Sequence, residues 1–146
     1  MFSRQFSQLI GSKKVRILLS AFAAFVGYGA WAFYANHAYI SAVSIKAALT
    51  QGSYSFVLTL SMSSFMEFLH QALGKARIRL PLTILITSLF LYTTSWGINK
   101  LLRTPEILMT ILPGMIIGTL YTFSYGLTLE KLSEKAPAIS NTPAAL

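Results

Sequence analysis

Four long stretches of this chain contain no charged side chain, and they constrain its fold more than any other feature. Residues 17–36, 47–66 and 80–99 form stretches of 20 residues each, and residues 107–129 form one of 23. A helix of about 20 mostly apolar residues crosses the hydrocarbon core of a bilayer and satisfies its own backbone there. We therefore predict an all-α integral membrane four-helix bundle. The second stretch is rich in serine and threonine, so we expect it inside the bundle.

The composition agrees with a membrane protein. Charged residues are 11% of the 146, whereas soluble domains have about a quarter. The 12 basic residues exceed the four acidic ones and give a net charge of +8. They flank the apolar stretches and form no nucleic-acid recognition motif, so we expect membrane lipids and not nucleic acid as partners. The chain has no cysteine for disulfide or thiolate chemistry.

The distribution of basic residues predicts the orientation. Nine of the 12 lie in the two tails or between the second and third stretches, and the others are Lys46, Lys100 and Arg103. Because lysine and arginine concentrate on the cytoplasmic side, we predict a multi-pass protein of a bacterial inner (plasma) membrane with both termini cytoplasmic. Residues 1–135 form one domain with spans at 16–36, 44–69, 80–101 and 105–128, and residues 136–146 form a disordered cytoplasmic tail.

Small residues recur at every fourth position of the last stretch: Gly114, Gly118, Thr122 and Gly126. A second face of this kind lies in the second stretch and consists of Ala48, Gly52, Ser55 and Thr59. Small residues on one face let helices approach closely in a bilayer, so we expect the two faces to pack against each other. The residues Thr104-Pro105-Glu106 predict the start of the last helix, with Thr104 as its N-cap.

The two halves of the chain show a partial similarity. Trp31 and Asn36 precede Tyr54 in the first half, and Trp96 and Asn99 precede Tyr121 in the second. Two halves that each cross the membrane and return would be parallel two-helix repeats. A chance match is the alternative, because aromatic residues are abundant here.

The carboxylates lie at the edges of the predicted spans, which argues against proton-coupled exchange through a buried acid. Glu67 and His70 have the spacing of a metal-ligand pair, but His37 is the one other histidine, so we expect no metal or cofactor. No nucleophile or phosphate-binding motif is present, and we expect no catalytic residue and no enzyme.

A polar cluster is expected on the outer side of the membrane. Its members are Lys46, Gln51, Asn99, Lys100 and Arg103. Three cations and two amides near the membrane surface suit an anionic headgroup such as a lipid phosphate. The alternative is that the cations only extend to the membrane surface.

The four-span layout with two similar halves resembles the GtrA-like family of small bacterial membrane proteins. That resemblance implies binding or translocation of an anionic lipid-linked substrate. The family's asparagine-arginine-aromatic signature is absent from the ends of the second and fourth spans, which read SSFMEF (63–68) and GLTLEK (126–131), so no functional residue carries over. The alternative function is a non-catalytic accessory subunit that packs against a larger membrane enzyme or transporter, or against another copy.

Overall fold

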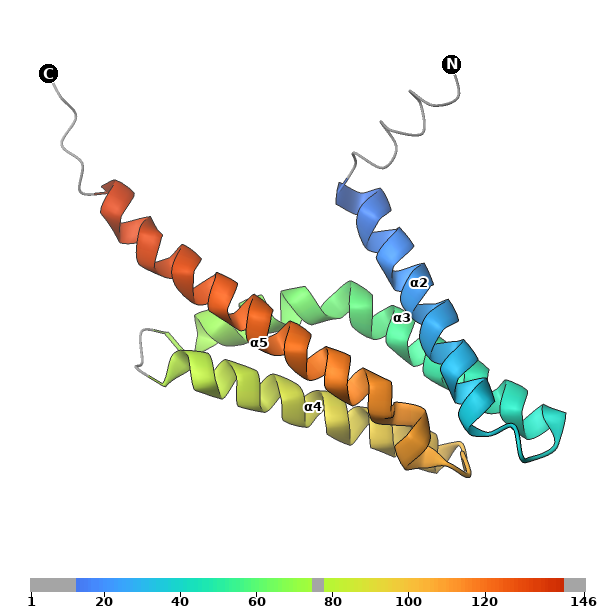
Figure 1. Ribbon diagram of the computed structural model, residues 1–146. Coiled ribbons are helices and arrows are strands. Elements are labelled where there is room, and N and C mark those ends of the chain that lie inside the picture. Colours follow the sequence, from blue (N-terminus) through green and yellow to red (C-terminus); the bar gives the residue numbers. More distant parts are fainter. Residues whose placement is uncertain (1–12, 75–77, 141–146) are drawn as a thin grey trace, which may run out of the picture.

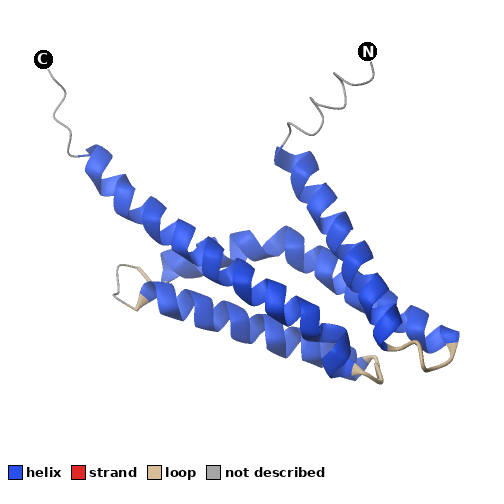
Figure 2. Ribbon diagram, in the orientation of Figure 1, coloured by secondary structure: helices blue, strands red, loops and turns tan. Residues whose placement is uncertain are grey.

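Four helices make up most of the part of the chain that the computed structural model describes, which is residues 13–74 and 78–140 (Figures 1 and 2). They are α2 (Lys13–Ala35), α3 (Ser41–Ala72), α4 (Arg79–Leu101) and α5 (Ile107–Ser140). Three segments are long and apolar enough to cross a membrane: Ile17–Ala35, Arg79–Leu101 and Ile107–Glu134. The chain is therefore an all-α membrane protein. The more polar helix α3 is not among the three.

The helices form two antiparallel hairpins, α2–α3 and α4–α5. Helix α2 contacts α3 and α5, helix α4 also contacts α3 and α5, and α3 contacts α5; among the described helices, α2 and α4 do not touch. Helices α2 and α5 lie close together where α2 ends and α5 begins, and they diverge toward the termini (Figure 1). We call the first end, which contains Asn36 and Asn99, the asparagine end. The opposite end, which contains Arg79 and Glu130, is the terminal end.

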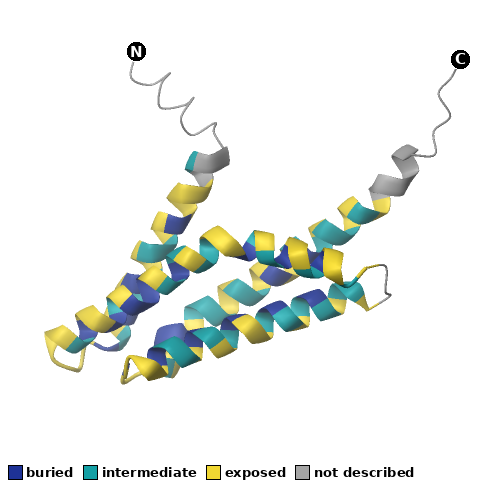
Figure 3. Ribbon diagram, turned by 180° about the vertical axis from the view of Figure 1, so that it is seen from behind, coloured by how far each residue is buried: buried dark blue, intermediate teal, exposed yellow. Residues whose placement is uncertain are grey.

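The interior is more polar than the exterior. Among the described residues, seven apolar and 13 polar or charged residues are buried, while 30 large apolar residues are exposed. Figure 3 shows that exposed positions recur along every helix. Three buried threonines donate their hydroxyl groups to the carbonyl four residues earlier: Thr83 to Arg79 at 2.9 Å, Thr110 to Glu106 at 2.6 Å and Thr122 to Gly118 at 2.7 Å. Lipid, and not water, is the solvent that suits such a surface.

Ala48 and Gly52 of the small face of α3 pack against α2. A Cβ at Gly52 would lie 2.8 Å from the backbone oxygen of Phe25, and a Cβ at Gly29 would lie 3.1 Å from the backbone oxygen of Ala48. The backbones of α2 and α3 therefore approach closely. The sequence-based prediction pairs α3 with α5 and does not include this contact.

The small face of α5 packs mainly against α4. A Cβ at Gly118 would lie 2.7 Å from Leu91 Cδ1, and one at Gly126 would lie 3.2 Å from both Leu80 and Ile84. The expected packing of Ala48, Gly52, Ser55 and Thr59 against Gly114, Gly118, Thr122 and Gly126 is therefore not the arrangement found at the glycines: Gly52 contacts α2, Gly118 and Gly126 contact α4, and Gly114 lies near Gln51 of α3. The physical reason is the short connection within each hairpin, which makes consecutive helices the nearest neighbours.

Helix α5 also begins and ends differently from the prediction. Thr104 is not its N-cap, because the Thr104 hydroxyl donates to Asn99 Oδ1 at 2.9 Å. Instead, Asn36, the residue directly after α2, accepts a hydrogen bond from the Glu106 N–H at 3.1 Å, so the cap comes from a distant part of the chain. At the other end the helix extends to Ser140, into the first residues of the predicted tail. Residues 141–146 lie outside the described part.

Candidate functional site

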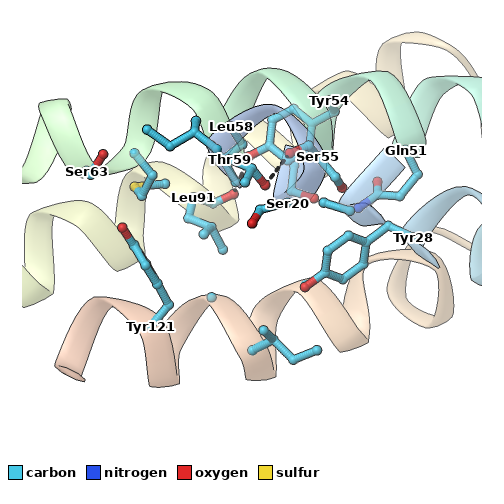
Figure 4. A pocket seen from close by; sticks show the side chains of 17 residues that line it. Ser20, Tyr28, Gln51, Tyr54, Ser55, Leu58, Thr59, Ser63, Leu91 and Tyr121 are labelled. Carbon is cyan, nitrogen blue, oxygen red and sulfur yellow. Dashed lines mark hydrogen bonds between the residues drawn. The ribbon is translucent and has the colours of Figure 1, made fainter. Parts of the chain in front are cut away.

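A cavity of about 420 Å³ lies among α2, α3, α4 and α5, and Figure 4 shows α3 and α5 on opposite sides of it. Among the residues that the structure describes, its lining contains no charged side chain. Apolar residues such as Ile17, Leu58 and Ile117 line one part of it. Polar side chains line another part and include Tyr28, Gln51, Ser55 and Ser95. The cavity therefore offers both an apolar and a hydrogen-bonding surface.

The cavity exists because α2 and α5 are joined at the asparagine end and diverge beyond it. Asn36 Nδ2 donates to Thr110 Oγ1 at 2.9 Å, in addition to accepting from the Glu106 N–H. Tyr39, in the loop after α2, donates to a Glu106 carboxylate oxygen at 3.0 Å. These contacts fix the start of α5 against the end of α2.

Pro113 adds a further connection between the same two helices. A proline inside a helix has no N–H and leaves the carbonyl four residues earlier without its usual partner. Here that carbonyl belongs to Met109, and the indole Nε1 of Trp31 donates to it at 2.7 Å. Helix α2 thus satisfies the backbone group that the proline frees. The cavity begins at the next residue, Gly114.

A buried amide network forms the polar wall. Asn99 Nδ2 donates to Gln51 Oε1 at 2.9 Å and to the Ser95 carbonyl at 3.0 Å, and both amide residues are at most 1% exposed. Thr104 donates to Asn99 Oδ1 from the loop. The network joins α3 to α4 and places Gln51 at the cavity wall.

The predicted outer cluster divides into two parts. Gln51 and Asn99 come together in the interior, as the sequence suggested, whereas Lys46, Lys100 and Arg103 are exposed and do not line the cavity. The structure therefore does not form one site from all five residues. Sequence analysis missed Tyr28 and Ser95, because a hydroxyl in an apolar stretch has no distinctive pattern.

An ion pair connects the helices at the terminal end. Arg79 of α4 donates to the two carboxylate oxygens of Glu130 on α5, at 3.1 and 2.8 Å, and also to Ser133 at 2.6 Å. His70 of α3 is buried with its Nε2 3.5 Å from Glu130. Burial, and next the neighbouring Arg79, lower the pKa of His70, while Glu130 opposes this. The neutral imidazole is therefore favoured.

Glu67 has a different partner. The Tyr125 hydroxyl donates to its carboxylate at 2.6 Å, so Glu67 and His70 contact separate groups on α5. Within the described ranges, no group of three potential metal-ligating side chains is found.

Comparison with protein-family models, with curated proteins and with solved structures found no match. The fold defines the class as a helical membrane protein with three helices suited to cross a membrane. The resemblance to the GtrA-like family remains a prediction.

Proposed function

We propose that this chain is a four-span membrane protein that binds a lipid-like amphiphile between α2 and α5 and carries its polar part into the membrane interior. The cavity is the observation that supports this proposal, because it combines apolar and hydrogen-bonding walls between two diverging helices. Pockets that bind small molecules have such mostly apolar linings with a few placed polar groups.

The relative direction of the helices supports a fourth span. The Asn36 contacts with Glu106 and Thr110 place the end of α2 beside the start of α5, which follows the end of α4. Helices α2 and α4 therefore run in the same direction. If both cross the membrane, α3 must cross back between them. The positive charges then favour cytoplasmic termini in a bacterial inner membrane.

The contacts also support two parallel repeats. Each of Asn36 and Asn99 donates to the carbonyl four residues earlier and to the second helix of the other hairpin, at Thr110 and Gln51 respectively. The helix contacts follow the same two-fold pattern, since each first helix contacts both second helices. Repeats of this kind form substrate sites between them in many transporters.

The exposed cations also support the proposal, because they suit an anionic headgroup at the membrane surface. Lys46, Lys100 and Arg103 lie toward the asparagine end, where they would attract an anionic headgroup. An anionic lipid-linked substrate is therefore compatible with these residues. The cations would attract the headgroup of such a substrate first, and entry of the substrate into the uncharged cavity would be a second step.

Filling the cavity tests the proposal. A Cβ at Gly114 would lie 3.8 Å from Gln51 Nε2 and 3.9 Å from Tyr28 Cε1, so a leucine there fits at its base and extends into the cavity. Gly97 has nothing within 4 Å of its Cβ position and does not line the cavity, so Gly97→Leu is the matched control. We expect Gly114→Leu to lower the lipid that copurifies per protein in detergent, measured by mass spectrometry, and the control to leave it unchanged. Equal lipid content in both variants would refute the proposal.

The accessory-subunit function has one supporting observation. Ala23 and Gly27 are exposed on α2, and nothing lies within 4 Å of a Cβ at Gly27. This open small face suits a helix of another chain. Under that function Gly27→Leu, and not Gly114→Leu, would release a copurifying membrane partner.

A further inference from the structure

The Gln51 amide is held in one orientation by its neighbours. The Ser95 carbonyl can only accept, so the nitrogen of Asn99 must face it, and the oxygen of Asn99 accepts from Thr104. The same Asn99 nitrogen faces Gln51, which must therefore present its oxygen. The nitrogen of Gln51 is the group that remains.

That nitrogen faces the cavity. Gln51 is 1% exposed and lines the cavity, and the hydrogen bond found for its side chain among the described residues is the one that its Oε1 accepts from Asn99. Gly114 of α5 faces the Gln51 nitrogen, because a Cβ added at Gly114 would be in ordinary contact with it at 3.8 Å. Tyr28 of α2 lines the same cavity, and its ring carbon Cε1 would lie 3.9 Å from that Cβ, while its hydroxyl points toward the middle of the cavity (Figure 4). Two hydrogen-bonding groups from different helices therefore border the cavity around Gly114.

The surroundings of this position disfavour an ion. Of the side chains that the structure describes, no charged one lines the cavity, and Lys46, Lys100 and Arg103 are exposed elsewhere. Burying a phosphate without a cation is costly, whereas a neutral acceptor gains hydrogen bonds at little desolvation cost. Gln51 is also seven residues, about 10 Å, inside the predicted start of the second span at residue 44, whereas a lipid phosphate lies at the membrane surface.

We infer that the Gln51–Tyr28 position binds an uncharged hydrogen-bond acceptor of a lipid, such as the ester carbonyl or hydroxyl of a diacylglycerol, and excludes a phosphate. This inference rests on the proposed lipid-binding function. It specifies which chemical group of the amphiphile enters the cavity. The cavity then selects neutral lipids, while the exposed cations act at the membrane surface alone.

Two lipids that differ by one phosphate test the inference. The purified full chain in detergent is incubated with dioleoylglycerol or dioleoyl phosphatidic acid, and retained lipid is quantified after gel filtration. We expect dioleoylglycerol to bind about tenfold more tightly, because the phosphate has no counter-charge in the cavity. Gln51→Leu and Tyr28→Phe should each weaken dioleoylglycerol binding about two- to tenfold, as expected for one lost hydrogen bond. Tyr92→Phe is the matched control, because the Tyr92 hydroxyl bonds Thr119 away from this cavity.

The outcomes separate the inference from the proposed function. Equal or tighter binding of phosphatidic acid would overturn the inference while keeping lipid binding in the cavity. Unchanged dioleoylglycerol binding in Tyr28→Phe, the conservative variant, would also overturn it, even if Gln51→Leu failed to fold. Failure of both lipids to bind, with no effect of Gly114→Leu on copurifying lipid, would refute the proposed function as well.

Discussion

Replacing Gly52 by alanine should destabilise the fold, because α2 and α3 approach most closely there. The added Cβ would lie 2.8 Å from the backbone oxygen of Phe25 and 3.1 and 3.2 Å from two of its ring carbons. A backbone oxygen cannot rotate away, so helix α2 must shift along its contact with α3. Overpacking of this kind costs about 1–3 kcal/mol, although alanine recovers up to about 1 kcal/mol through its helix propensity.

Two other glycines provide internal comparisons. Gly118→Ala should cost less than Gly52→Ala, because its obstacle is a terminal methyl group of Leu91, which lines the cavity and has space to turn. Gly97→Ala meets nothing within 4 Å and should be neutral or stabilising. The effects should therefore rank Gly52, Gly118 and Gly97 in decreasing order of cost.

Unfolding of each variant in mixed detergent, followed by circular dichroism as the denaturing detergent increases, measures these differences. The double variants sharpen the test. Leu91→Ala should remove most of the cost of Gly118→Ala, whereas Phe25→Ala should rescue Gly52→Ala little, since the carbonyl stays in place. Equal destabilisation by Gly52→Ala and Gly97→Ala would refute the close approach of α2 and α3.

Three further predictions concern single contacts and topology. Trp31→Phe should destabilise the fold by about 1 kcal/mol in the same unfolding assay, because it leaves the carbonyl freed by Pro113 without a donor; an equal loss in a Pro113→Ala background would contradict this role. The pKa of the buried His70 lies below its usual value of 6.5, so the unfolded state takes up the proton first and stability should fall as pH decreases through that value. His70→Gln should flatten this part of the unfolding profile, and an unchanged slope would contradict the assignment. Reporter fusions near Gly74 and after the last residue should be cytoplasmic and one near Ala38 external; a periplasmic signal at the C-terminus would reject four spans.

The candidate site was only partly predictable from sequence. Gln51 and Asn99 stood out as amides at the ends of apolar stretches, and the structure brings them together. Their expected partners, Lys46 and Arg103, are exposed, because a long cationic side chain gains more from the membrane surface than from an uncharged interior. Tyr28 could not be recognised as a cavity residue from the sequence, because its place in the cavity wall depends on where the other helices lie.

The sequence by itself determined the helices and their solvent. An uncharged stretch of about 20 residues predicts a helix in a bilayer, because its hydropathy and its internal backbone hydrogen bonds depend on that stretch alone. Tertiary structure alone decided which faces meet. The Asn36 cap on α5 spans 70 residues, and the Arg79–Glu130 pair spans 51. Such contacts depend on loop length, helix direction and the shapes of opposing side chains, none of which a single stretch encodes. The cavity follows from the same cause, since it forms where two distant helices are joined at one end and diverge at the other.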